Sequence, residues 1–210
     1  MVAHTTEEEQ VEAIKRWWKA NGTSVVVGLV VGLGVLVGGN YWMENTAAQR
    51  QNASLEFAQL QDDLQQMRAD AVMTRGDHII NSFSDTPYAV LSAFAIAKIK
   101  VDEGDLLSAR ARLQWVLDNS DQPEFLHMAR MRMAAVMLAE GNGEGALALL
   151  DGVDAGAFLP LYEELKGDIY LSLSQQSQAR SAYERALRAN DKGDNSLLQM
   201  KLDGLGDEDA

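Results

Sequence analysis

The chain has 210 residues, with 18 Lys and Arg against 31 Asp and Glu, and it contains no Cys. The net charge of −13 argues against binding to nucleic acid or to anionic lipid headgroups, which are themselves negatively charged. Without Cys, disulfides and thiol chemistry are excluded, so packing alone must hold the fold together.

An uncharged stretch of 24 residues, from Ala20 to Met43, lies near the N-terminus. As a helix it would be roughly 36 Å long, which is enough to cross a hydrocarbon core of about 30 Å. Because lipid offers the backbone no hydrogen-bond partners, a stretch that enters a membrane must be helical. We therefore expect an N-terminal segment 1–22, a transmembrane helix 23–43 and a soluble domain 44–210.

The charges beside this stretch predict its orientation. Lys15, Arg16 and Lys19 precede it, whereas the first positive charge after it is Arg50. Lys and Arg are enriched on the cytoplasmic side of membrane helices. The N-terminus is therefore expected in the cytoplasm, and the soluble domain is expected to be exported.

The same stretch has two alternative interpretations. A cleavable signal peptide usually has a shorter apolar core, and the bulky Tyr41-Trp42 follows the loose cleavage site at Gly38-Gly39. A buried core helix would not need so many Gly residues and would not lack polar ones. An uncleaved anchor agrees better with the length and the flanks of the stretch.

Four glycines within the stretch form two small-xxx-small pairs, which permit close packing between membrane helices. These candidate contact residues are Gly28, Gly32, Gly34 and Gly38. The alternative is that Gly is simply frequent in membrane helices.

The soluble domain contains a repeat that its prolines mark. Pro87, Pro123 and Pro160 are separated by 36 and 37 residues, and each opens a helix-compatible segment. Pro suits a first helical turn, where its missing amide hydrogen has no intrahelical partner. We expect three repeat units and a capping helix, at about 87–122, 123–159, 160–192 and 195–203.

Each unit carries the same pattern of residue sizes after a central Gly104, Gly141 or Ser174. Small, large and small-to-medium residues follow at matching offsets: Ala109, Ala146 and Ala179, then Leu113, Leu150 and Tyr183, then Val116, Val153 and Ala186. The pattern resembles the tetratricopeptide repeat, a helix–turn–helix unit of about 34 residues. Ala97 and Ala134 stand where the motif has its first Gly, which the third unit keeps as Gly167. The predicted fold is all-α, with a single N-terminal transmembrane helix followed by a tetratricopeptide-repeat-like α-solenoid.

Upstream of the first proline, residues 46–72 contain neither Pro nor Gly and carry an apolar stripe at helical spacing. This pattern predicts one helix over the whole segment. A short helix at about 77–83, with Gly76 as the break before it, would complete a partial first pair.

The sequence contains no catalytic or metal-binding constellation. The three His residues, His4, His78 and His127, lie in different segments, and no His or Cys pattern has metal-ligand spacing. Adjacent carboxylates such as Asp62-Asp63 point in different directions on a helix, so they form no dyad. Phosphate-loop, dinucleotide and nucleophile-elbow motifs are absent as well. We therefore expect a protein that is not an enzyme and that uses no cofactor.

The function of such a chain would lie in its surface. In tetratricopeptide repeats, the first helix of each pair lines a concave groove that holds partners. The corresponding positions are Leu91, Phe94 and Lys98, then Met128, Met131 and Ala135, then Leu161, Glu164 and Asp168. We expect a partner-binding groove at the apolar members, Leu91, Phe94, Met128, Met131 and Leu161, whose side chains can adapt to apolar partners. The alternative is that they pack against the 46–72 helix, because core is the usual fate of such stripes.

Six stretches, in the expected order, carry a family resemblance: Glu9 to Trp18, Gly39 to Trp42, Phe125 to Ala134, Gly167 to Ile169, Ala179 to Tyr183 and Leu197 to Asp203. They make the chain similar to the YfgM family, the ancillary subunit of the bacterial SecYEG translocon. The resemblance implies a single-pass protein of the bacterial inner membrane, with a cytoplasmic N-terminus and a periplasmic C-terminal domain. Its implied partners are SecYEG, the membrane-anchored periplasmic chaperone PpiD, and translocating or unfolded client proteins.

The expected function is that of a non-enzymatic adaptor that helps pass exported proteins from the translocon to periplasmic chaperones. The alternative is a membrane-tethered repeat scaffold for envelope assembly, division or stress signalling, without contact to the translocon. An enzyme with an unusual site is the third interpretation, which the absence of catalytic motifs disfavours.

Overall fold

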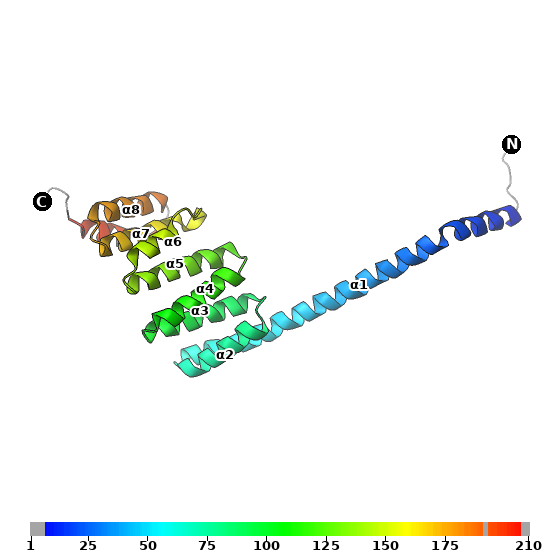
Figure 1. The fold of residues 1–210 in the computed structure, drawn as a ribbon, viewed down its shortest axis with the longest axis horizontal. Coiled ribbons are helices and arrows are strands. Elements are labelled where there is room, and N and C mark those ends of the chain that lie inside the picture. The colour runs from blue at the N-terminus through cyan, green and yellow to red at the C-terminus, as the bar shows by residue number, and fades with distance from the viewer. Residues whose placement is uncertain (1–6, 191–192, 207–210) are drawn as a thin grey trace. The chain divides into compact units, whose positions relative to one another are not determined.

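The computed structural model describes residues 7–190 and 193–206, and all regular structure in these two ranges is helical (Figure 1). The predicted all-α fold is confirmed. The helices are α1 (Glu7–Gln65), α2 (Ala69–Ser82), α3 (Pro87–Asp102), α4 (Leu106–Asn119), α5 (Pro123–Ala139), α6 (Gly143–Leu150), α7 (Leu159–Ser172), α8 (Gln176–Ala189) and α9 (Ser196–Asp203). The chain divides into two compact units, one up to Gln51 and one from Asn52 onward.

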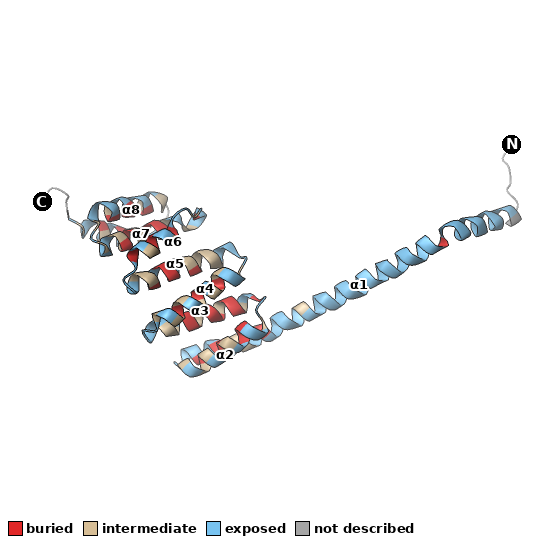
Figure 2. Cartoon of the chain, viewed as in Figure 1, coloured by how far each residue is buried: buried red, intermediate tan, exposed pale blue. Residues whose placement is uncertain are grey.

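The first unit consists, where it is described, of the N-terminal part of α1. Within the described ranges, α1 is the one helix that is long and apolar enough to cross a membrane. Only 6% of its most apolar 18-residue window is buried, and Figure 2 shows this part of the helix exposed. Because the core helix of a soluble protein would be mostly buried, this exposure argues against that alternative.

The second unit is a stack of helix pairs. From α2 to α9 each helix contacts the next one in the chain, and Figure 1 shows this order for α2 to α8. The end of α1 is tied to α2 through Arg75, whose Nε donates a hydrogen bond to Asp63 at 3.0 Å. The described residues therefore contain four pairs, α1 with α2, α3 with α4, α5 with α6 and α7 with α8, followed by α9. The three prolines had marked only the last three.

Apolar side chains form three clusters along this stack. The first joins α1 to α5, the second joins α5 to α7, and the third joins α8 to α9. The residues at the predicted repeat offsets are buried in them, apart from the half-buried Val153. Each cluster thus connects helices that are close in the chain.

The first helix of each predicted pair ends in the same backbone turn. The φ angle is positive at Gly104, Gly141 and Ser174, with values of 79°, 80° and 59°. In the first of these turns, the amides of Gly104 and Asp105 donate to helix carbonyls at 3.0 and 2.8 Å. This is the Schellman motif, in which a left-handed residue allows the last carbonyls of a helix to be satisfied.

Helix α1 ends in the same turn, with Met67 in the left-handed position at a φ of 55°. The Met67 amide donates to the Leu64 carbonyl at 3.1 Å, and the Arg68 amide donates to the Asp63 carbonyl at 2.9 Å. The prediction of one helix over 46–72 is therefore wrong. A Met occupies the turn position at which Gly or Asn is usual, so the composition contains no turn signal.

Helix α2 also differs from its prediction, because Gly76 does not break a helix. It lies inside α2, which begins at Ala69 rather than near residue 77, and it is buried. A Cβ placed on Gly76 would lie 2.8 Å from Ile96 Cδ1 and 3.4 Å from Leu60 Cδ1. Glycine suits this position because a Cβ there would require the end of the Ile96 side chain to move.

The two helices of each pair carry residues of complementary size at one shared position. These residues stand seven before and nine after the left-handed residue, and all are buried: Leu60 with Gly76, Ala97 with Leu113, Ala134 with Leu150, and Gly167 with Tyr183. In the first and last pairs, the large side chain lies directly against the glycine. In each of the other two pairs, both residues belong to the same core cluster. The alanines that depart from the repeat motif therefore stand opposite Leu, whereas the motif Gly stands opposite Tyr.

Candidate functional site

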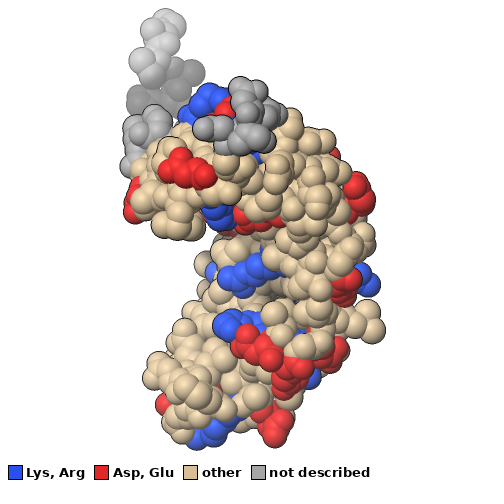
Figure 3. All heavy atoms as spheres, turned by 90° about the vertical axis from the view of Figure 1, so that its left-hand side faces the viewer, with Lys and Arg blue, Asp and Glu red and all other residues tan. Residues whose placement is uncertain are grey.

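Helices α1, α3 and α5 line a cavity of about 1070 Å³ in the second unit. Apolar side chains make up much of its wall, including Phe57 and Leu64 of α1, Leu91 and Phe94 of α3, and Met128 of α5. Figure 3 shows a hollow on one side of the helix stack, with Lys and Arg side chains along its wall. The cavity is slightly larger than the roughly 300–1,000 Å³ of typical small-molecule pockets, so it offers room for side chains of a partner segment.

The structure divides the five predicted groove residues into two groups. Leu91, Phe94 and Met128 lie together in the cavity wall. Phe94 is also a core residue with 5% of its surface exposed, and Met128 packs against the same cluster. Met131 packs against the second cluster instead, and Leu161 is 51% exposed on α7, away from the cavity.

Of the remaining groove positions, two on the third repeat are occupied by the chain itself. Lys201 of α9 donates to Glu164 at 2.8 Å and to Asp168 at 2.7 Å. Tyr183 also donates to Asp168, at 2.7 Å. Burial disfavours the charged form of Lys201, but its hydrogen bonds to the two carboxylates outweigh that effect and raise its pKa. Through Lys201, helix α9 thus provides the ion-pair partner for the two carboxylates at the groove positions of the third unit.

The cavity wall also contains Arg132, which lies over the ring of Phe94 at 4.5 Å from the ring centroid. Burial lowers the pKa of this guanidinium. Among the described residues, no carboxylate is within ion-pair distance of Arg132. By contrast, Lys98 in the same wall pairs with Asp102 at 2.7 Å.

The sequence pattern missed several residues of this cavity. Arg132 lies four residues after Met128, so helical spacing alone places both on one face of α5. Phe57, Leu64 and Val72 were not assigned to the groove, because the first helix pair was predicted with the wrong boundaries. Their signal was the apolar stripe upstream of Pro87, which had been interpreted as a single helix.

Several titratable residues of the described ranges have structural partners. His127 Nδ1 lies 3.0 Å from the Tyr162 hydroxyl, and its ring stacks on Phe158. Asp63 is buried, and hydrogen bonds from Arg75 and Arg68 hold its pKa below the usual value. No group of three or more His, Cys, Asp or Glu in these ranges could hold a metal ion. The third histidine of the sequence, His4, lies outside the described residues.

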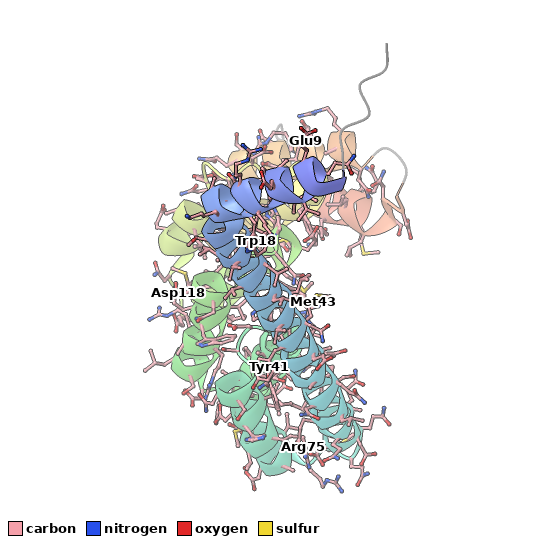
Figure 4. The ribbon with its side chains drawn as sticks, turned by 90° about the vertical axis from the view of Figure 1, so that its right-hand side faces the viewer. Glu9, Trp18, Tyr41, Met43, Arg75 and Asp118 are labelled. Carbon is pink, nitrogen blue, oxygen red and sulfur yellow. The ribbon has the colours of Figure 1, made fainter. Side chains whose placement is uncertain are left out.

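The four glycines proposed for membrane packing lie in the first unit. A Cβ placed on any of them would meet no atom within 4 Å, so their faces are open. Figure 4 labels Trp18 and Tyr41, which lie toward the two ends of the apolar stretch, and both are exposed. Such aromatic residues are typical of membrane interfaces.

Comparison with known proteins adds to these observations. The sequence model of the family described as "Tetratricopeptide repeat-like domain" matches residues 15–207. The chain is 28% identical to the "Ancillary SecYEG translocon subunit" of Haemophilus influenzae, over 97% of this chain and 100% of that protein. It is 26% identical to the protein of the same name from Escherichia coli, over 98% of this chain and 99% of that protein.

A solved structure supports the fold alone. The crystal structure of a tetratricopeptide repeat protein from Parabacteroides merdae superposes with a TM-score of 0.59 at 14% sequence identity. The match covers 74% of this chain and 60% of that one. This match and the family model confirm the repeat fold. The relatives named above confirm the resemblance found in the sequence.

Proposed function

The chain belongs to the tetratricopeptide repeat-like domain family, and on that premise we propose that it is an ancillary subunit of the SecYEG translocon in the bacterial inner membrane. The observation that carries this proposal is the end-to-end match to relatives with that name, which includes the apolar helix as well as the repeats. Two proteins that share both a long apolar helix and a repeat scaffold in the same order have the same means of holding a scaffold at a membrane.

The proposed topology has residues 1–22 in the cytoplasm, 23–43 in the membrane and 44–210 in the periplasm. Lys15, Arg16 and Lys19 support it, because such residues are retained on the cytoplasmic side. The exposure of α1 over its apolar stretch agrees with a lipid environment.

The proposed mechanism is non-enzymatic. The second unit would bind exported chains through protein–protein contacts and help pass them to periplasmic chaperones, with PpiD as the proposed membrane-anchored partner. The cavity between α1, α3 and α5 supports this mechanism, since it offers apolar wall residues that no other segment of the described chain fills. Repeat scaffolds present such concave surfaces to other proteins.

Photo-crosslinking in native membranes tests the proposal. A photoreactive residue at Gly32 or Val35 should capture a translocon subunit, because both positions lie on the exposed apolar part of α1. The same probe at Leu107, which is 68% exposed on α4, serves as the matched control and should not capture a membrane-embedded subunit.

Failure of both membrane positions to capture a translocon subunit would contradict the proposal. Capture of division or envelope-assembly proteins instead would favour a membrane-tethered scaffold that acts without the translocon.

A further inference from the structure

The cavity between α1, α3 and α5 combines an apolar wall with a cation that has no counterion. Arg132 reaches into this wall and lies over Phe94, yet no carboxylate of the described residues pairs with it. A cation beside apolar surface loses part of its hydration, and a paired carboxylate would compensate for that loss. A ligand that enters this cavity can therefore gain from carrying a negative charge.

The other charges of the cavity wall are already balanced within the chain. Lys98 pairs with Asp102, and Arg68 pairs with Asp63. Glu103 is held by Lys100 at 2.8 Å. Arg132 is thus the wall residue whose charge remains available, and the domain that surrounds it is strongly acidic.

The far end of the stack shows how this repeat surface binds a complementary charge. There Lys201, on the short helix α9, pairs with Glu164 and Asp168, while Leu198 and Leu202 of the same helix are buried. Apolar side chains supply the contact area, and one charged side chain pairs with the repeat. At the cavity the repeat instead offers the positive charge of Arg132, and no segment of the described chain fills the cavity.

The apolar surface continues beyond the cavity itself. Leu64, Met67 and Val101, which all contribute to the wall, are 38%, 92% and 40% exposed. An exposed apolar margin of this kind can accommodate successive side chains of a polypeptide.

We propose that this cavity binds a polypeptide segment that carries apolar side chains and a carboxylate, and that the carboxylate pairs with Arg132. This inference rests on the proposed function and specifies which segments of exported proteins the scaffold binds. Apolar segments that carry Lys or Arg in place of the carboxylate are bound more weakly.

Peptide binding to the full chain in lipid nanodiscs tests this inference. The probes are three fluorescein-labelled peptides of alternating Leu and Ser, with a central Glu, Gln or Lys, and empty nanodiscs correct for partition into lipid. Wild-type chain should bind the Glu peptide roughly tenfold more tightly than the Gln peptide, because a charge-assisted pair contributes about that factor. The Lys peptide should bind most weakly.

Charge reversal assigns the preference to one side chain. Arg132→Glu should reverse the order of the Glu and Lys peptides. Arg130→Glu, which makes the same charge change on α5 outside the cavity wall, should leave the order unchanged. Circular dichroism shows whether each variant is folded. If Arg132→Glu is not folded, Arg132→Gln is used in its place.

Three results would overturn the inference: equal affinity of the wild type for all three peptides, an unchanged order in a folded Arg132 variant, or the same reversal in Arg130→Glu. Arg132-dependent binding of a labelled fatty acid without binding of the Glu peptide would assign the cavity to lipid and also overturn it. Crosslinking from Gly32 does not involve the cavity. A translocon crosslink combined with no peptide preference would therefore remove this inference and leave the proposed function standing.

Discussion

At the scale of single residues, side-chain volume controls how closely the helices of a pair approach. Gly167 faces Tyr183, and Gly76 faces Leu60, so the large residue is on the second helix in one pair and on the first helix in the other. Interiors are packed closely enough that one added methyl group at such a position is felt. In all four pairs this position therefore combines one small residue, Gly or Ala, with one large residue, Leu or Tyr.

Substitution of Gly167 should show this dependence. A Cβ there would lie 2.3 Å from Tyr183 Cε1, so Gly167→Ala should lower the free energy of unfolding by about 1–2 kcal/mol through overpacking. The clash must exceed the gain of about 1 kcal/mol that Ala usually brings to a helix interior. Chemical denaturation of the single variant measures the change.

The double variant with Tyr183→Leu provides the control, because Ala opposite Leu already occurs in the two preceding units. In that background Gly167→Ala should be neutral or stabilising. An equal cost of Gly167→Ala in both backgrounds would show that the two side chains are not coupled.

At the scale of helices, the turn that ends the first helix of each pair defines the repeat. Its left-handed residue is Gly in two units, Ser in the third pair of the predicted pattern, and Met67 at the end of α1. A residue with a Cβ in this region is strained by about 1–2 kcal/mol, so tertiary contacts must hold the turn at Met67 in place. The hydrogen bonds of Asp63 with Arg68 and Arg75 are the contacts next to it.

Replacement of Met67 by Gly should relieve this strain. Because Met67 is 92% exposed, Met67→Gly removes little packing, and it should raise the free energy of unfolding by about 0.5–1 kcal/mol. The unfolding midpoint in denaturant is the measurement.

The converse substitution is the matched control. Gly104 has a φ of 79°, and a Cβ there would meet no atom within 4 Å, so Gly104→Ala tests backbone strain without a clash. Gly104→Ala should lower the free energy of unfolding by about the amount that Met67→Gly raises it. A loss of stability in Met67→Gly would mean that the exposed Met side chain contributes more than its backbone strain removes.

At the scale of the whole molecule, the second unit is held by contacts between successive helices. Its three apolar clusters each join neighbours, and α9 covers the last of them with Leu198 and Leu202. In such stacks the free energy of unfolding is approximately the sum of the stabilities of single repeats and of the interfaces between neighbours. The loss of a terminal helix should therefore destabilise the adjacent helices most.

Removal of the residues from 191 onward should therefore affect the two ends of the stack differently. Amide hydrogen exchange should accelerate in α7 and α8, which lose the cover of Leu198 and Leu202 and the ion pairs of Lys201. Exchange in α2, α3 and α4 should be unchanged.

Lys201→Gln, which removes the charge but keeps the helix, should produce a smaller effect in the same two helices. Equal acceleration throughout the second unit would show that the stack unfolds as one cooperative body instead.

Much of this molecule could be predicted because its signals are local or periodic. The uncharged stretch from Ala20 to Met43 indicates a helix that suits a membrane, and the spacing of Pro87, Pro123 and Pro160 indicates the last three pairs. The size pattern at Ala109, Leu113 and Val116, and at the matching positions of the other units, fell on buried residues apart from the half-buried Val153. Each of these inferences needs only the composition and spacing of residues along the chain, and none needs a contact between helices.

Tertiary structure alone decided the features that depend on neighbouring helices. The boundaries of the first pair were predicted wrongly because Met67 forms a turn that other residues stabilise, and because Gly76 lies inside α2 against Ile96, twenty positions away. The acidic positions of the third unit look like open groove in sequence, yet Lys201 occupies them. Sequence by itself thus determined the long apolar helix, the fold class and the repeat, since these follow from local hydrophobicity and periodicity. Structure decided which groove positions stay open and where Arg132 stands unpaired, since both depend on which distant side chains meet.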